Sequence, residues 1–149
     1  MIPFFQIVTT ISIGLMIGAE FAVWAFINPI IWRLEEPSRM EAIRYFARRL
    51  GKVMPFWYVF NLILLVSEAF LLRRETRSTL IGAAAGIWAV VIILTLMFLV
   101  PINNRLASWN SHQPVDQAQR EHKRWDAMHR ARVVALETAM VLFLLAVNS

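Results

Sequence analysis

The chain has 149 residues, of which 58% are hydrophobic and 17% are charged. With a mean hydropathy of +0.56 it is too apolar for an ordinary soluble domain, so the composition predicts an integral membrane protein. The absence of cysteine excludes disulfides, cysteine-bound zinc, iron–sulfur clusters and thiol chemistry, and the net charge of +5 is typical of the basic loops of membrane proteins rather than of nucleic-acid binding.

The first apolar segment, residues 3–27, contains a single charged residue, Glu20. It is long enough to cross a bilayer as a helix, which takes about 20 residues. A cleavable signal peptide would carry Lys or Arg before a shorter apolar core and small residues after it, and this segment has neither. We therefore expect it to remain as the first membrane span.

Residues 28–52 are rich in Arg and Glu, with apolar side chains interleaved. Ser38 follows Pro37 and precedes Glu41 by three residues, a spacing typical of a helix start, and Gly51 is a common helix end. The pattern predicts an amphipathic helix that lies at the membrane interface. It also suits a helix that is docked over the mouth of a bundle.

Three further apolar segments follow, at residues 53–72, 79–100 and 128–147. The short turn between the first two makes them antiparallel neighbours, and Pro101 is expected to end the second of them. The sequence therefore predicts one all-α domain over residues 1–149. This domain is an antiparallel bundle of four transmembrane helices, with the interfacial helix between the first two spans.

Small residues recur at helical spacing in two of these spans, at Gly14 with Gly18 and in the stretch Gly82-Ala83-Ala84-Ala85-Gly86. Small side chains let helix backbones approach closely in lipid. Both patches are therefore predicted to be sites of helix packing.

Twelve of the 15 Lys and Arg residues lie in or beside the loops 28–52 and 101–127, and the other three lie in the turn 73–78. Positive residues favour the cytoplasmic side, so we expect both loops in the cytoplasm and both termini outside, in a plasma (inner) membrane. The expected partners are membrane lipids and a hydrophobic small molecule, with no nucleic acid. Homo-oligomerisation is left open.

Several polar residues lie inside the predicted spans, where an ionisable group is costly and commonly faces the bundle interior or a wet cavity. At about 1.5 Å per residue, Glu20, Asn61 and Glu137 lie at comparable depths below the loop-rich end and are predicted to form one polar layer. Above this layer we expect the mouth of a pocket, although its tryptophans also suit an aromatic belt at the membrane surface. The side chains expected there are Trp24, Asn28, Trp57, Asn103, Asn104, Trp109, Trp125, His129 and Arg132.

Two further sets of polar residues are set apart from this pocket. His112 and His122 belong to a polar loop and are expected to be solvated. Glu68 lies near the opposite end of its span, and it is either functional or paired with one of three arginines, Arg73, Arg74 or Arg77.

Three short stretches of the sequence carry a family resemblance. They are Glu20-Phe21 with Phe26-Ile27-Asn28-Pro29, then Val100-Pro101-Ile102-Asn103-Asn104-Arg105-Leu106, and Trp125-Asp126-Ala127-Met128-His129-Arg130-Ala131-Arg132. In them the chain resembles the anthrone oxygenase-like family of small four-helix membrane proteins, over nearly its whole length. The resemblance implies a membrane oxidoreductase or oxygenase that uses dioxygen to convert an anthrone, a hydrophobic aromatic molecule, into an anthraquinone.

Such an oxidation begins with loss of a proton from an activated ring, so the site needs a base and a partner for the resulting oxyanion. We expect His129 or Glu20 to remove the proton. Arg132 and Asn103 are expected to stabilise the oxyanion. Indole rings would stack on the flat substrate, and the expected substrate-binding side chains are Trp24, Asn28, Trp57, Asn61 and Trp125.

A metal-dependent form of this reaction is the first alternative. Imidazole and carboxylate ligands suit iron, copper or manganese, so His129, Glu20 and Glu137 would then be metal ligands and dioxygen would bind at the metal. Their spacing matches no known metal motif. The sequence therefore leaves the cofactor unknown, with a metal-free site as the other form.

A non-catalytic role is the second alternative. The bundle would bind a lipid or quinone-like ligand, or serve as an assembly partner, and its buried carboxylates would only fix the register of the helices. Convergence of Glu20, Asn61, His129 and Arg132 on one cavity favours catalysis, whereas pairwise neutralisation favours the structural role. A permeation pathway ranks last, because the outer halves of the first and fourth spans are almost wholly apolar.

Overall fold

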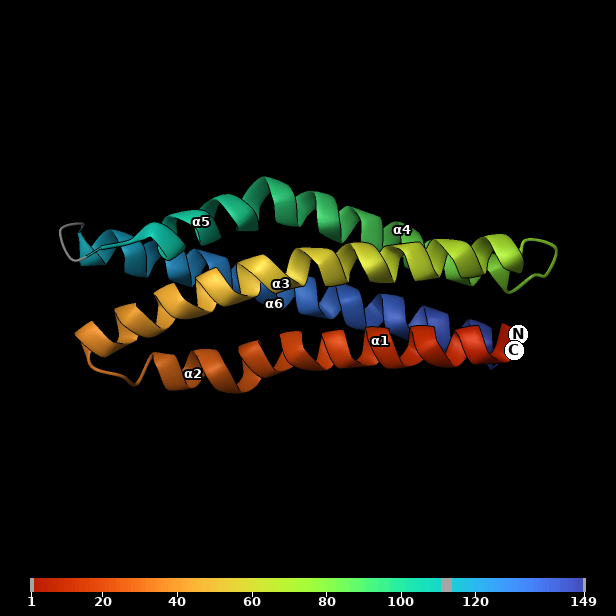
Figure 1. Ribbon diagram of the computed structural model, residues 1–149, viewed down its shortest axis with the longest axis horizontal. Coiled ribbons are helices and arrows are strands. Elements are labelled where there is room, and N and C mark those ends of the chain that lie inside the picture. The colour runs from red at the N-terminus through yellow and green to blue at the C-terminus, as the bar shows by residue number, and fades with distance from the viewer. Residues whose placement is uncertain (1, 111–113, 149) are drawn as a thin grey trace.

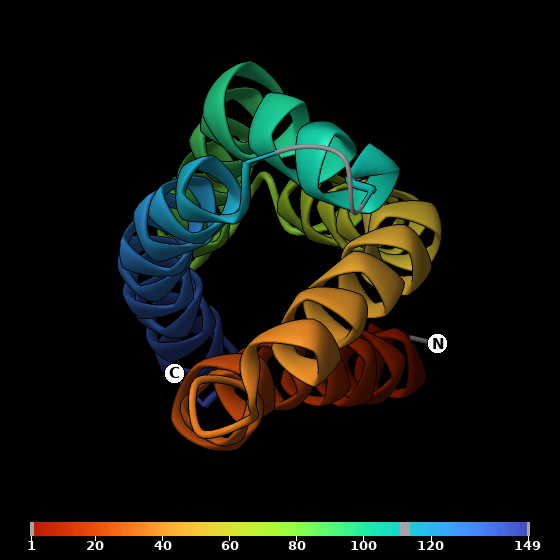
Figure 2. The same ribbon diagram turned by 90° about the vertical axis from the view of Figure 1, so that its left-hand side faces the viewer.

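The computed structural model describes residues 2–110 and 114–148, and within these ranges all regular secondary structure is helical. Four long helical segments surround a common axis (Figure 2), and successive segments run in opposite directions (Figure 1). Both termini lie at one end of the bundle, which we call the terminal end (Figure 1). The opposite end, which we call the loop end, is formed by α2, α5 and the starts of α3 and α6. With η marking a π-helical turn, the elements are α1 (Ile2–Ala22), η1 (Val23–Ile27), α2 (Asn28–Ile31), α3 (Glu36–Leu71), α4 (Ser78–Leu94), η2 (Thr95–Leu99), α5 (Val100–Ser108) and α6 (Val115–Val147).

Three of the segments are long and apolar enough to cross a membrane, namely Pro3–Ile31, Glu36–Leu71 and Ser78–Ser108. Large apolar side chains cover the outside of the bundle, and Phe56 and Phe4 are 80% and 72% exposed. Such a surface is unfavourable in water and compatible with lipid. The fold therefore fits a membrane protein.

The last helix, α6, is not among these three apolar segments. Arg130, Arg132 and Glu137 interrupt the stretch predicted as the fourth span. Its terminal half nevertheless packs into the bundle core, where Phe143 and Ala146 are fully buried.

Two of the helical segments contain a π-helical turn immediately before a proline. The N–H of Asn28 donates to the carbonyl of Val23, and that of Val100 donates to Thr95, in each case five residues back. Proline removes one helical hydrogen bond and crowds the preceding turn, and a widened turn accommodates both effects. The prediction that Pro101 ends its helix is therefore wrong, because the chain continues as α5 to Ser108.

The separate interfacial helix predicted within residues 28–52 is also wrong. Residues 28–31 form α2, and residues 36–52 belong to α3, one continuous helix over Glu36–Leu71 that has Glu35 rather than Ser38 at its N-cap position. The loop-end half of α3 packs its Met40 and Ile43 into a core shared with α5 and α6. Burial of this face explains why the helix does not stop at the bilayer surface.

Gly51 lies in the interior of α3 and marks a close approach rather than a helix end. A Cβ atom at Gly51 would lie 2.6 Å from Nδ2 of Asn103 on α5, and this nitrogen donates a 2.9 Å hydrogen bond to the carbonyl of Ala47. The absent side chain therefore makes room for a contact that joins α3 to α5.

The predicted small-residue packing sites are confirmed in part. Apart from neighbouring residues and the backbone of its own helix, no described atom lies within 4 Å of a Cβ built at Gly18, Gly82 or Gly86, while the Cβ position of Gly14 is in ordinary contact with Met140. In the stretch 82–86 the buried residues are alanines, and Ala84 is 0% exposed. The glycines thus face outward and the alanines form the helix contact.

Replacing Gly51 with alanine is expected to destabilise the protein. A helical glycine-to-alanine change normally stabilises by up to about 1 kcal/mol. Here the Asn103 side chain must move and lose its hydrogen bond to Ala47, a loss of about 1–3 kcal/mol that should outweigh this gain and lower the melting temperature in detergent. Gly82→Ala is the matched control, because its added Cβ meets open space. Equal shifts of melting temperature in the two variants would contradict the close approach.

Candidate functional site

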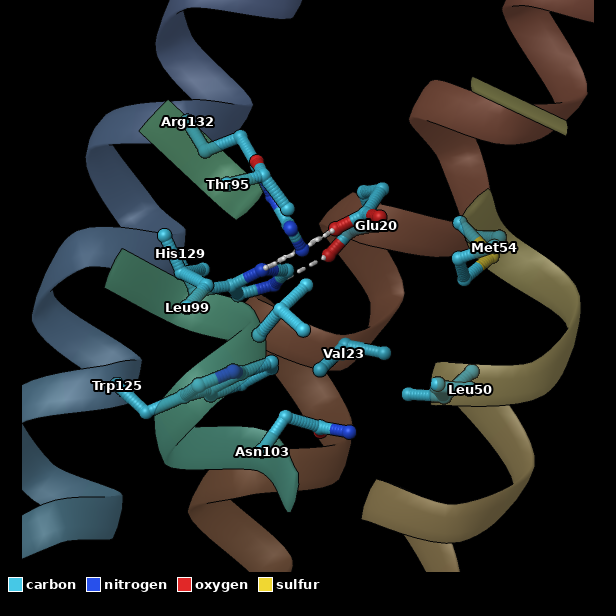
Figure 3. A pocket seen from close by; sticks show the side chains of 13 residues that line it. Glu20, Val23, Leu50, Met54, Thr95, Leu99, Asn103, Trp125, His129 and Arg132 are labelled. Carbon is cyan, nitrogen blue, oxygen red and sulfur yellow. Dashed lines mark hydrogen bonds and ion pairs between the residues drawn. The ribbon is translucent and has the colours of Figure 1, made fainter. Parts of the chain in front are cut away.

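A buried ion-pair cluster lies where α1, α3 and α6 meet. The Glu20 carboxylate is 3% exposed, and its Oε2 accepts a 2.6 Å hydrogen bond from Nη2 of Arg132. Its Oε1 accepts a 2.9 Å hydrogen bond from the hydroxyl of Tyr58, and the Arg132 guanidinium lies 5.4 Å from the Tyr58 ring centre. His129, one turn before Arg132 on α6, completes the cluster (Figure 3). Three side chains from two helices, α3 and α6, thus surround the carboxylate of α1.

The contacts of His129 identify which ring nitrogen can take up a proton. Its Nε2 lies 3.1 Å from the backbone carbonyl of Glu20, which only accepts, so Nε2 carries the hydrogen. Its Nδ1 lies 2.9 Å from Nη2 of Arg132 and 3.1 Å from Oε2 of Glu20. In the neutral ring Nδ1 accepts from Arg132, and in the protonated ring it donates to Glu20. Both charge states of His129 therefore have a partner at Nδ1.

The cluster forms one wall of a small inner cavity (Figure 3). Its other walls are mostly apolar, and its volume of about 60 Å³ admits a few molecules the size of water or dioxygen. The Trp125 ring stacks on His129 with centroids 4.7 Å apart and an interplanar angle of 11°. The lining residues are Ala19, Glu20, Val23, Leu50, Gly51, Met54, Thr95, Leu99, Val100, Asn103, Trp125, His129 and Arg132.

A lateral groove lies between the α4–η2 segment and α6, next to the inner cavity. It has a volume of about 290 Å³ and is almost wholly apolar. Thr95, Leu99 and Arg132 line both the groove and the inner cavity, so they form the partition between the two. A third, smaller cavity of about 20 Å³ lies toward the loop end and shares Asn103 and Trp125 with the inner cavity.

Five of the residues predicted for the site come together at the inner cavity. These are Glu20, Asn103, Trp125, His129 and Arg132. Nδ2 of Asn103 already donates to the carbonyl of Ala47, which leaves Arg132 as the better placed of the two predicted oxyanion partners.

The structure places the other predicted binding residues elsewhere. Asn28 is buried and donates a 2.5 Å hydrogen bond to Asp126, beside the loop-end cavity. Trp24 packs edge-on against Phe21, with centroids 5.7 Å apart. These two side chains therefore contact neighbours within the helix bundle or at its outer face.

Trp57 and Asn61 belong to a second polar contact, nearer the terminal end. The indole of Trp57 donates to Oγ of Ser12 at 3.1 Å, and this hydroxyl donates to Oδ1 of Asn61 at 2.6 Å. Asn61 also contacts the sulfur of Met16. The predicted single polar layer is thus wrong for Asn61, because a helix turn separates it from Tyr58, which is the α3 residue that reaches Glu20.

The predicted metal ligands do not form a metal site. Glu137 lies eight residues beyond His129 on α6, a rise of about 12 Å along the helix. Among the described residues no group of three or more His, Asp and Glu side chains is placed to hold a metal ion. The Glu20 oxygens are instead occupied by Arg132, Tyr58 and His129.

Two residues of the site, Tyr58 and Thr95, were not predicted from the sequence. Tyr58 shares the buried stripe of α3 with Asn61, Leu65 and Glu68, so helical periodicity would have placed it inside. Thr95 is the only residue with a hydroxyl group between residues 80 and 107, in an otherwise apolar stretch. An isolated hydroxyl in a membrane helix is a signal that merits attention.

Among the described residues Glu68 makes no direct ion pair with the arginines of the 73–78 turn, although Arg77 lies close enough to act on its charge. Arg77 forms an ion pair with Glu75, and Arg73 lies over the ring of Phe70. Neither carboxylate oxygen of Glu68, which is 2% exposed, has a hydrogen-bond partner within residues 2–110 and 114–148.

His122 was predicted to be solvated, and that prediction is wrong. It is 4% exposed and packs between Trp32 and Trp125, with ring centroids 5.1 Å and 6.1 Å away. The interpretation failed because the polar segment continues α6 along the bundle, which buries the face bearing His122, Trp125 and His129. The other predicted solvent histidine, His112, lies outside the described residues.

Comparison with known proteins gives one match. The sequence model of a family described as anthrone oxygenase matches residues 44–142, which is more than half of the chain. The matched range contains Tyr58, Thr95, Trp125, His129 and Arg132, while Glu20 precedes it. No curated protein and no solved structure matches the chain.

Burial of His122 makes the stability of the protein depend on pH. Burial lowers the pKa of His122 from 6.5 to about 4, against an opposing effect of the Asp126 carboxylate. Between these two values the unfolded chain binds a proton that the folded protein does not, so stability falls as the pH drops from about 6.5 toward 4.

The loss assigned to His122 should be about 2–3 kcal/mol between pH 7.5 and 4.5. Thermal unfolding in detergent at several pH values checks this, with His122→Gln as the comparison. The wild type should lose more stability than the variant over this range. Parallel pH profiles would show that His122 is not held neutral by burial.

Proposed function

The chain belongs to the anthrone oxygenase family, and on this basis we propose that it is a membrane-embedded oxygenase. Its substrate class is a hydrophobic aromatic molecule of the anthrone type, and its co-substrate is dioxygen. The observation that carries the proposal is the buried Glu20–His129–Arg132 cluster in the wall of an otherwise apolar cavity. A base beside a fixed positive charge is what formation of a stabilised ring anion requires.

The proposed reaction converts a ring methylene and dioxygen into a ring carbonyl and water. Loss of one proton, from the methylene or from the hydroxyl of the phenol tautomer, gives the same electron-rich anion. Dioxygen accepts electrons from this anion and forms a carbon–oxygen bond. The second methylene C–H bond then loses its proton, its electron pair forms the carbon–oxygen double bond, and the oxygen–oxygen bond breaks. The departing oxygen takes up the two protons and leaves as water. Dioxygen is the only oxidant that this balance needs.

We assign the role of base to His129. Its Nδ1 lone pair, which accepts from Nη2 of Arg132 in the resting neutral ring, takes up the substrate proton in this proposal, and the protonated Nδ1 then donates a hydrogen bond to the Glu20 carboxylate at 3.1 Å. Glu20 is a weaker candidate, because Arg132, Tyr58 and His129 all contact its two oxygens. In this proposal Glu20 stabilises the protonated His129, and Arg132 stabilises the substrate oxyanion.

The proposal places the protein in the membrane as four crossings. The terminal half of α6 packs against α1 and α4, which belong to two of the three apolar segments, and this supports a fourth crossing. The positive-inside bias supports cytoplasmic loops at 28–52 and 101–127 and both termini outside a plasma membrane. The groove between α4 and α6 would then face lipid.

Replacing His129 with glutamine is expected to lower the rate of anthrone oxidation. Loss of a general base typically costs about 100-fold or more in kcat. The measurement is dioxygen uptake with an anthrone, corrected for the rate without protein. His122→Gln is the matched control, since it removes a second buried histidine from the same face of α6 but outside the inner cavity. Equal rates for the two variants would remove the base role from His129.

A non-catalytic role has one observation in its favour, namely that Arg132 already neutralises Glu20. In that case the cavity would bind a quinone-like molecule without changing it. Saturable binding of an anthrone with no dioxygen uptake above the protein-free rate would establish this role.

A further inference from the structure

We propose that the partition between the lateral groove and the inner cavity is a binding site for one oxygen atom of an aromatic ketone or phenol. The atoms that bind it are Oγ1 of Thr95 and Nε of Arg132, and the ring system lies in the groove after entering sideways from the lipid. The inference rests on the proposed function, because it identifies how the substrate of that reaction is held.

Thr95 differs in its hydrogen bonding from three other helical threonines of the chain, Thr9, Thr10 and Thr138. The hydroxyls of Thr9, Thr10 and Thr138 each donate to the carbonyl four residues back, at 2.7–3.0 Å. Oγ1 of Thr95 is buried and has no hydrogen-bond partner among the described residues. Thr95 is the first residue of η2, where the helical register changes. A π-helical turn of this kind is frequent at functional sites.

Arg132 contributes the second unpartnered atom. Its Nη2 contacts Glu20 and His129, but its Nε is buried without a hydrogen-bond partner anywhere in the described part of the chain. The side chain is 10% exposed. A buried polar atom without a hydrogen-bond partner is costly. Two such atoms in one wall, Oγ1 of Thr95 and Nε of Arg132, therefore indicate that this wall binds a polar group of a ligand.

The groove determines the kind of ligand that fits. Its other lining side chains are apolar, and Leu94 and Phe98 on its rim are 47% and 43% exposed on the outside of the bundle. Its volume of about 290 Å³ approaches the lower end of small-molecule sites, whereas the inner cavity is several times too small. A flat hydrocarbon ring system with a single polar oxygen at the inner edge matches this distribution of polarity.

The hydrogen-bond chemistry also matches an oxygen that becomes charged during the reaction. The guanidinium Nε only donates, and the threonine hydroxyl donates or accepts. Both can therefore donate to one carbonyl or phenolate oxygen. Nη2 of the same guanidinium lies 2.9 Å from Nδ1 of His129. Binding the oxygen here places it beside the base, so the proton taken is that of the phenol hydroxyl.

Two ligands of equal ring size test the polar part of this site. Anthraquinone and anthracene share three fused rings, and only anthraquinone has oxygen atoms. Their binding to the detergent-solubilised protein is measured by equilibrium dialysis, corrected for partition into empty micelles. Thr95→Val, which removes the hydroxyl but keeps the shape, should weaken anthraquinone binding about five- to tenfold, the usual effect of one buried hydrogen bond. Anthracene binding should not change, and Thr95→Ser should restore anthraquinone binding.

The position of the ring system is tested by filling the groove. Ala131 lines the groove, so Ala131→Phe should reduce binding of anthraquinone and anthracene alike. Ala127→Phe, one turn earlier on α6, lies outside the groove lining and is the matched control. Circular dichroism and melting temperature show that each variant is folded.

Three outcomes would overturn the inference. Unchanged anthraquinone affinity in Thr95→Val would remove the hydroxyl from the site, and equal loss for both ligands would show a packing effect only. Displacement of anthraquinone by oleate, with stronger and equally Thr95-dependent binding of oleate, would assign the groove to a lipid carboxylate. The binding measurements need no turnover, so the two proposals can fail separately. Dioxygen uptake without Thr95-dependent anthraquinone binding would overturn this inference alone. Thr95-dependent anthraquinone binding without dioxygen uptake would overturn only the oxygenase proposal.

Discussion

Burial of the Glu20 carboxylate is the constraint on which the rest of the bundle depends. An ionised group inside an apolar bundle is tolerated only when its charge and its hydrogen-bonding capacity are both satisfied. Arg132 and His129 bring α6 to Glu20, and Tyr58 brings α3. The indole of Trp88 on α4 donates a 3.0 Å hydrogen bond to the backbone carbonyl of Tyr58, so all four helical segments are joined around one carboxylate. The requirement that holds the helices in register thus also assembles the candidate site.

The prolines explain why an open space exists beside this cluster. Each π-helical turn before Pro29 and Pro101 widens its helix, and both turns contribute residues to the inner cavity. The hydroxyl of Thr95, the first residue of η2, has no hydrogen-bond partner among the described residues, whereas Thr9, Thr10 and Thr138 donate to backbone carbonyls. The turn before Pro101 therefore coincides with an unsatisfied polar atom in the cavity wall. The cavity thus lies beside turns that accommodate prolines, and the base and the oxyanion partner are the residues that neutralise the buried Glu20 carboxylate.

Sequence reasoning found the elements that depend on composition and missed those that depend on contacts between helices. The apolar stretches and the polar face carrying Glu20, His129 and Arg132 follow from hydropathy and helical periodicity. The ends of helices did not, because Gly51 and Pro101 are ordinary stop signals that packing between α3 and α5 and a π-helical turn override. Equal depth along separate helices was also a poor guide, since Asn61 contacts Ser12 while Tyr58 reaches Glu20. The depth of a residue in the bundle also depends on how its helix tilts and shifts against its neighbours, which the sequence does not specify.

The central claim is that this cavity catalyses transfer of an oxygen atom from dioxygen to an aromatic ring. Anthrone is supplied with isotopically labelled dioxygen to the purified protein in lipid vesicles, and labelled quinone is followed by mass spectrometry. The account predicts one labelled oxygen atom per quinone, formed far faster than in protein-free vesicles. Labelled quinone that forms at the same rate with and without the protein would contradict it.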